Sequence, residues 1–218
     1  MKRTDRAPLP GTPNSARISS NNNNRFGAVL SALDSFWISR DAATTSATHA
    51  ARKDAYTIIL FDGQANIYVA NDFTSSPDQL LDSILNKGQG RGTDFGVALQ
   101  VAQSAMEDHW SSERSPVLIF LSDGECRLDE VRVYDICRRA ISLGKSLSLH
   151  AVSFGNDRYA GYLRNMAKIA TEVQAGAPVD QQGPPCGYTS ALDTVQLAET
   201  FLGIAESMRK PRAALIRH

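Results

Sequence analysis

Two short segments of the chain carry side-chain oxygens of the kind that bind a hard metal ion. One is Gly-Thr-Asp at 92–94, and the other is Ser-Asp-Gly at 122–124, which directly follows an apolar run. Mg²⁺ prefers oxygen ligands in octahedral geometry and keeps several of its bound waters. A threonine hydroxyl and an aspartate carboxylate from neighbouring loops suit that preference. Thr93 and Asp123 are therefore the predicted metal ligands.

A helix and a hairpin are the first elements expected to position these loops. An apolar stripe at helical spacing predicts a helix with Asn24 as its N-cap. The stripe consists of Phe26, Val29, Leu30, Leu33 and Trp37. The β-rich run at 55–61 ends in Asp62-Gly63, which is a strong hairpin signal, so residues 66–70 should return antiparallel beside it.

Buried strands alternate with helices through the rest of the chain. Residues 116–121 are apolar throughout, which is typical of a parallel strand covered on both faces, and residues 147–154 form a further strand. Apolar stripes at helical spacing precede and follow these strands. The alternation predicts an α/β fold with a doubly wound, mostly parallel sheet, one antiparallel edge strand and helices on both faces. Both predicted metal-binding loops then lie at the carboxyl ends of strands, where open α/β sheets bind ligands.

The composition favours one globular domain with short tails. The chain has 218 residues, of which 42% are hydrophobic, enough for a sizeable core. Residues 1–24, with three prolines and four consecutive asparagines, are expected to form a disordered leader. Residues 25–208 should form the domain and residues 209–218 a C-terminal tail.

Charge and cysteine content argue against several partners and locations. Lysine plus arginine (23) equals aspartate plus glutamate (23), so electrostatics give no basis for binding nucleic acid or a membrane surface. Three cysteines without CxxC spacing argue against a disulfide framework and a zinc site, and favour a reducing compartment. No secretory h-region and no apolar run near ~20 residues occur, so the expected location is cytoplasmic.

The order of the expected elements resembles that of von Willebrand factor A domains, over roughly residues 25–208. The resemblance rests on the hairpin, the Gly-Thr-Asp-Phe loop, the buried strand ending in Ser-Asp-Gly, and the later strand ending in Ser-Phe-Gly. It implies a non-enzymatic module that binds a protein partner, in which a cation such as Mg²⁺ bridges a metal-ion-dependent adhesion site to a partner carboxylate. Thr93 matches the loop threonine of that site, and Asp123 matches the aspartate after the fourth strand. Four neighbours would shape the two loops: Gly92, Asp94, Ser122 and Gly124.

The chain departs from the family pattern upstream of these residues. The family's site also includes an Asp-x-Ser-x-Ser segment after its first strand, and neither that segment nor a buried strand before Asn24 occurs here. The chain therefore holds two of the five site residues that the resemblance implies. The implied first strand would lie centrally, between residues 55–61 and 117–121. We expect either an N-terminally incomplete domain or an abandoned metal site.

Two other function classes stay open at this point. One is a metal-independent scaffold with a vestigial site, in which Asp94 and Asp123 are ordinary helix-cap or turn residues. The other is a hydrolase or nucleotide-binding enzyme on a similar frame. No GxSxG, GxxxxGK or HExxH pattern supports that enzyme, and the glycines of Gly88-Gln-Gly-Arg-Gly follow a helical segment rather than a strand.

Overall fold

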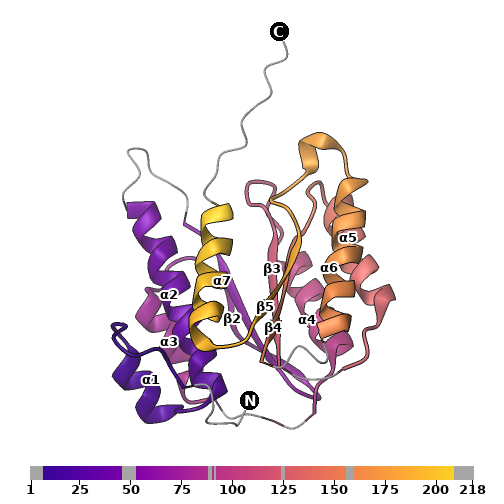
Figure 1. Ribbon diagram of the computed structural model, residues 1–218. Coiled ribbons are helices and arrows are strands. Elements are labelled where there is room, and N and C mark those ends of the chain that lie inside the picture. The colour runs from indigo at the N-terminus through magenta and orange to yellow at the C-terminus, as the bar shows by residue number, and fades with distance from the viewer. Residues whose placement is uncertain are drawn as a thin grey trace.

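The chain folds as alternating strands and helices in a computed structural model that describes residues 7–45, 53–87, 90, 92–123, 126–155 and 160–208 (Figure 1). The helices are α1 (Ser15–Asn21), α2 (Arg25–Thr45), α3 (Pro77–Leu85), α4 (Phe95–Asp108), α5 (Glu130–Ser142), α6 (Ala160–Ala175) and α7 (Thr194–Ser207). The strands are β1 (Tyr56–Phe61), β2 (Ala65–Asp72), β3 (Val117–Ser122), β4 (Ser148–Phe154) and β5 (Gly187–Ala191). Among the described helices, none has the length and apolar character needed to cross a membrane.

The predicted hairpin is confirmed as the antiparallel pair β1–β2. Phe61 pairs with Ala65 across the turn, and the Asp62 carboxylate accepts a hydrogen bond from the backbone N–H of Gln64 at 2.8 Å. This side-chain bond to the backbone two residues on is the reason that aspartate favours such turns.

Strands β3, β4 and β5 form a parallel sheet in that order, with β4 in the middle. The prediction of an α/β fold with a mostly parallel sheet is therefore confirmed. Sequence patterning did not reveal β5, because Gly-Tyr-Thr-Ser-Ala lacks an apolar run. Residues 187–191 form a strand because they pair with β4, for example Ala191 with Phe154, and not because of their local sequence.

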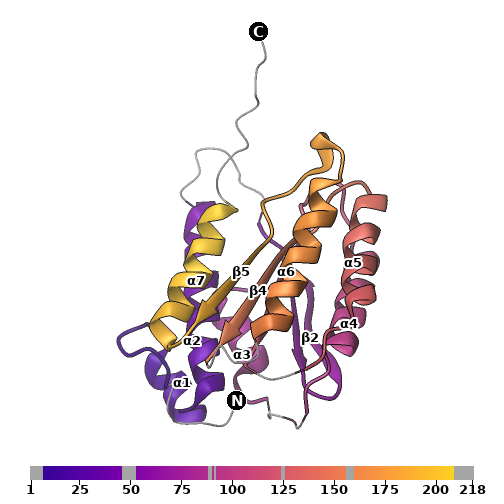
Figure 2. The ribbon, with the colours of Figure 1, turned by 45° about the vertical axis from the view of Figure 1, so that its right-hand side comes forward.

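The helices cover the sheet layer on both faces, which confirms the doubly wound arrangement. One apolar cluster joins α1, α2, α3 and α7 to the strands, and another joins α4, α5 and α6 to them (Figures 1 and 2). Strand β4 serves both clusters, because Val152 and Phe154 belong to the first and Leu149 and Ala151 to the second. The alternation follows from the two-residue period of a strand.

The sheet layer is interrupted between β1 and β3, which belong to separate hydrogen-bonded sheets. In β4 every residue except His150 is buried, whereas in β3 only Phe120 and Ser122 are buried and the others are half-buried. Five of the six residues of β1 are also half-buried. The interruption lies where the family resemblance places a first central strand, and the described residues supply no strand there.

Helix α2 begins as predicted but extends further than its apolar stripe. The Asn24 side chain accepts hydrogen bonds from the backbone N–H groups of Phe26 (2.9 Å) and Gly27 (3.2 Å), so Asn24 is the predicted N-cap. The helix continues to Thr45, well past Trp37, the last residue of the predicted apolar stripe. Arg40 explains part of this extension, because it forms an ion pair with Asp54.

Part of the expected disordered leader is ordered. Residues 15–21 form α1, and the Ile18 side chain in that helix is completely buried. The Asn22 side chain donates a hydrogen bond to the backbone oxygen of Leu85 at 2.7 Å. A single apolar side chain in a short polar segment is too weak a signal to predict this packing from the sequence.

His150, in the middle of β4, should make stability depend on pH. Burial lowers the pKa of His150 below its ordinary value of 6.5. Below about pH 6.5 the unfolded chain therefore takes up the proton first, and the free energy of unfolding falls as the pH decreases toward the folded-state pKa. We expect His150→Gln to weaken this acid sensitivity in urea unfolding at pH 7.5 and pH 5.5. The matched variant His109→Gln changes an exposed histidine and should leave the acid sensitivity of unfolding unchanged. Equal effects of the two variants on that sensitivity would contradict its assignment to His150.

Candidate functional site

The first predicted loop lies against the β1–β2 turn. Gly92 has a φ of +88°, which glycine adopts without strain, and a Cβ at this position would lie 3.5 Å from the backbone nitrogen of Gly63. The backbone N–H of Asp94 donates to the backbone oxygen of Asp62 at 2.7 Å. The hydrogen bond from Asp94 fixes the backbone directly after Thr93, and the positive φ of Gly92 sets the turn directly before it.

Asp94 is the N-cap of α4, as the simpler interpretation of the sequence proposes. Its carboxylate accepts a hydrogen bond from the backbone N–H of Val97 at 3.0 Å. Thr93 is half-buried, and its hydroxyl forms no hydrogen bond within the described ranges. Thr93 therefore keeps an oxygen available at the amino end of α4, whereas Asp94 is committed to the helix.

Asp123 directly follows β3 and pairs with a residue that the sequence did not single out. One carboxylate oxygen, Oδ2, lies 3.3 Å from Nη1 of Arg25, the first residue of α2. The Arg25 side chain is 10% exposed and the Asp123 side chain 20%. The available signal was a charged residue placed directly after the N-cap of an apolar-striped helix. Its partner could not be inferred, because 98 residues separate the two.

A cluster of three phenylalanine rings lies next to the two loops and connects the elements that carry them. The ring of Phe120 lies 5.1 Å from that of Phe61 and 5.0 Å from that of Phe95, between ring centres. Phe95 comes two residues after Thr93, and Phe120 three residues before Asp123. Thr93 and Asp123 thus lie at the same end of the sheet layer, and their action as metal ligands stays a prediction. Gly124, the last residue of the predicted set, lies outside the described residues.

The residues present do not by themselves fit a magnesium ion. Within the described ranges, no group of three or more histidine, cysteine, aspartate or glutamate side chains is placed to hold a metal. Thr93 and Asp123 offer two side chains, and a carboxylate oxygen of Asp123 already faces a guanidinium. Mg²⁺ gives up its bound waters reluctantly. A donor set of this size therefore cannot displace enough of them to hold the ion.

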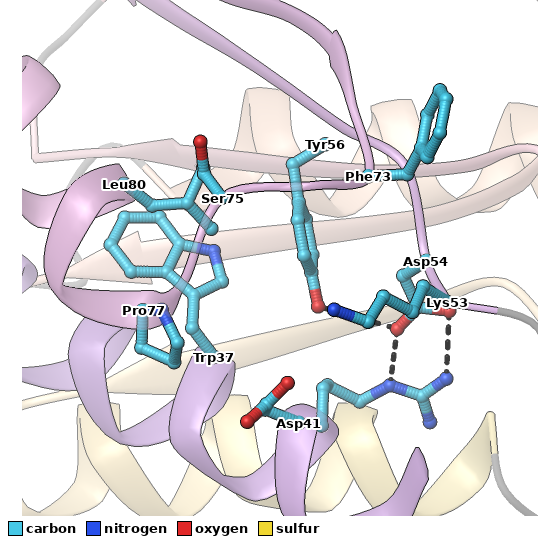
Figure 3. A pocket seen from close by; sticks show the side chains of 10 residues that line it. Trp37, Asp41, Lys53, Asp54, Tyr56, Phe73, Ser75, Pro77 and Leu80 are labelled. Carbon is cyan, nitrogen blue, oxygen red and sulfur yellow. Dashed lines mark hydrogen bonds and ion pairs between the residues drawn. The ribbon is translucent and has the colours of Figure 1, made fainter. Parts of the chain in front are cut away.

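A second polar cluster lies between α2 and β1 and lines a small pocket (Figure 3). Nε and Nη2 of Arg40 donate to the two carboxylate oxygens of Asp54 at 2.6 and 2.9 Å, and the Tyr56 hydroxyl donates to the same carboxylate at 3.3 Å. Nη1 of Arg40 also donates to the backbone oxygen of Ala205 in α7. Burial, followed by the charge of Asp54, raises the pKa of Tyr56 well above its usual range.

This second cluster stabilises the fold rather than offering a binding site. The pocket has about 20 Å³ of internal space, enough for about one water molecule. Small-molecule sites usually measure about 300–1,000 Å³. Arg40 in α2 instead makes three hydrogen bonds to two groups, the Asp54 carboxylate just before β1 and the Ala205 backbone oxygen in α7, and so connects these segments.

Comparison with known proteins gives the family. The von Willebrand factor type A domain matches residues 14–125 of the chain, a little more than half of it. The chain therefore belongs to the von Willebrand factor type A domain family. Domains of this family are typically protein-interaction modules, some with a metal-ion-dependent adhesion site, and are generally not catalytic. A comparison with curated protein sequences gives no match.

Solved structures agree with this fold at low sequence identity. Proximal thread matrix protein 1 from the mussel byssus aligns with a TM-score of 0.59 and 9% identity, over 88% of this chain and 45% of that protein. The SpRpn10 VWA domain aligns with a TM-score of 0.57 and 11% identity, over 89% of this chain and 91% of that domain. The pilus adhesin SpaC from Lactobacillus rhamnosus GG aligns with a TM-score of 0.56 and 13% identity, over 88% of this chain and 29% of the adhesin.

These likenesses establish the fold and do not transfer a function. The chain spans less than half the length of the mussel protein, because the alignment covers only 45% of that protein. A second structure of the mussel protein, with a TM-score of 0.55, has a zinc-occupied metal-ion-dependent adhesion site motif. A metal is thus found at such a site in a structural relative, but the donor set of the present chain is smaller than the resemblance requires.

Proposed function

We propose that this chain is a non-enzymatic protein-interaction module that contacts its partner at the carboxyl ends of β1 and β3. The observation that carries the proposal is the shared position of the two loops, which the Phe61, Phe95 and Phe120 rings hold at one end of the sheet layer. The Thr93 hydroxyl has no hydrogen-bond partner among the described residues and is free to accept or donate one.

The contact at this edge is proposed to be independent of a metal ion. The Arg25–Asp123 pair favours this form over the cation-bridged one, because the negative charge of Asp123 is already balanced. In the cation-bridged form, Thr93 and Asp123 would hold Mg²⁺, and a partner carboxylate would complete its ligands. That form requires additional oxygen ligands beyond the two side chains at this edge.

The proposal predicts which surface changes abolish partner capture. The immobilised chain, the variant Thr93→Ala and the variant Asp123→Asn would each be used to capture proteins, with Mg²⁺ and with EDTA. We expect both variants to lose the partners that the unaltered chain enriches, and EDTA to leave that enrichment unchanged. Capture that requires Mg²⁺ would instead support the cation-bridged form.

A matched control separates this edge from the general surface. Asp180 is an exposed aspartate in the short helix Val179–Gln181, which contacts the amino end of β4 through the bond from the Ser146 N–H to the Gln181 oxygen. Asp180→Asn should capture the same proteins as the unaltered chain. Retention of all partners by Thr93→Ala and Asp123→Asn would contradict the proposed edge.

A further inference from the structure

We infer that the Arg25 guanidinium is a built-in cation that occupies the place of a metal ion beside Asp123 and makes this end of the domain insensitive to divalent cations. The inference concerns the charge balance of the site and does not depend on any partner. It rests on the position of Arg25, on its contact with Asp123 and on the donors around them.

Arg25 is a buried cation in an electrostatically unfavourable place. It is the first residue of α2 and is 8% exposed as a whole residue. The amino end of a helix carries a partial positive charge, so a cation is disfavoured there. The cap itself is a neutral amide, because Asn24 bonds the N–H groups of Phe26 and Gly27. A buried guanidinium in this position needs an anion close by.

Asp123 supplies that anion across a long sequence separation. The Nη1–Oδ2 distance of 3.3 Å makes the contact both a hydrogen bond and an ion pair. The Asp123 side chain is 20% exposed, so water screens the pair only partly. The carboxylate that pairs with Arg25 is the one that a metal ion bound at Asp123 would also have to use.

A divalent ion at Asp123 would lie within a few ångströms of the Arg25 positive charge. Repulsion between charges at such a distance is strong when the surroundings are partly buried. A metal could bind only if Arg25 moved away, and this would leave a buried guanidinium without its carboxylate. Thr93 adds a single hydroxyl, which does not compensate for either cost.

The test is a titration of the full chain with Mn²⁺ alone, followed by the electron paramagnetic resonance signal of the free ion. We expect no saturable binding by the unaltered chain at micromolar Mn²⁺. Arg25→Gln removes the positive charge and should raise the affinity for Mn²⁺ by about tenfold or more. Adding Asp123→Asn to that variant should remove the gain.

Two controls keep the outcome specific. Arg139→Gln removes an arginine that pairs with Glu107 at 3.1 Å on the α4–α5 surface and should not change Mn²⁺ binding. Arg25→Lys keeps the charge and should stay insensitive to Mn²⁺. Saturable binding by the unaltered chain that Asp123→Asn abolishes would overturn the inference, as would an Arg25→Gln variant that folds and gains no affinity.

A second measurement covers the case in which Arg25→Gln does not fold. A ligand that binds the folded state raises the melting temperature. The unaltered chain should therefore melt at the same temperature with and without millimolar Mn²⁺. An upward shift that disappears in Asp123→Asn would overturn the inference without the arginine variant.

Discussion

Expressed alone, the 218-residue chain is expected to unfold at low urea concentration or to self-associate. Among the described residues, no strand pairs with the facing edges of β1 and β3, and every apolar side chain of β3 except Phe120 is only half-buried. An apolar strand of about five residues seated there would bury about 1.5–3 kcal/mol per side chain, or on the order of 10 kcal/mol. Ordinary domains have a total stability of about 5–15 kcal/mol, so the missing contribution is comparable with the whole.

Urea unfolding combined with analytical ultracentrifugation checks this expectation. Unpaired strand edges invite pairing with another chain, so the sedimentation coefficient should rise with protein concentration. Ile67→Lys is a useful control, because Ile67 is 43% exposed on β2 and is the alternative source of association. Association that disappears in Ile67→Lys would trace to that surface. A monomer with one cooperative transition and ordinary stability would show that the interruption is harmless.

Trp37→Ala is expected to lower the free energy of unfolding by about 3–5 kcal/mol. Trp37 is 3% exposed, and its ring meets that of Tyr56 edge-on with 6.5 Å between the ring centres. Truncation removes a large apolar side chain from the cluster that attaches α2 to the sheet layer and leaves a cavity. The variant and the unaltered chain would be compared by urea unfolding in the presence of trimethylamine oxide, which stabilises the folded state.

An exposed valine provides the reference for the tryptophan variant. Val195 in α7 is 54% exposed, and Val195→Ala should change the stability by less than about 0.5 kcal/mol. An effect of that small size for Trp37→Ala would mean that α2 does not pack as described. A large effect in both variants would point instead to a generally fragile fold.

The sequence predicted those parts of the fold that depend on residues close together along the chain. The Asp62-Gly63 turn, the Asn24 cap and the apolar faces of the helices each depend on residues within a few positions of one another. Strand β5 was not predictable, because its order comes from pairing with β4. Helix α1 was missed because a single buried side chain, Ile18, connects it to the core.

The candidate site was predictable in position and not in charge balance. Strand ends and loop glycines indicated where Thr93 and Asp123 lie, since both features are local. The Arg25–Asp123 pair joins residues 98 positions apart, and no local pattern encodes such a contact. The role of Asp94 was ambiguous although its signal is local. An aspartate directly before a helix is expected both for a helix N-cap and for a metal-binding loop.

The central place of β4 has a consequence for how the molecule opens. Strand β4 is bonded to neighbours on both edges and contributes side chains to both apolar clusters, so its amide hydrogens should exchange with solvent only when the whole domain unfolds. The β1–β2 hairpin has no strand partner beyond itself among the described residues. We expect it to open before the parallel sheet does, once its side chains leave the two clusters, and to take with it the Gly92–Asp94 loop, which is bonded to Asp62.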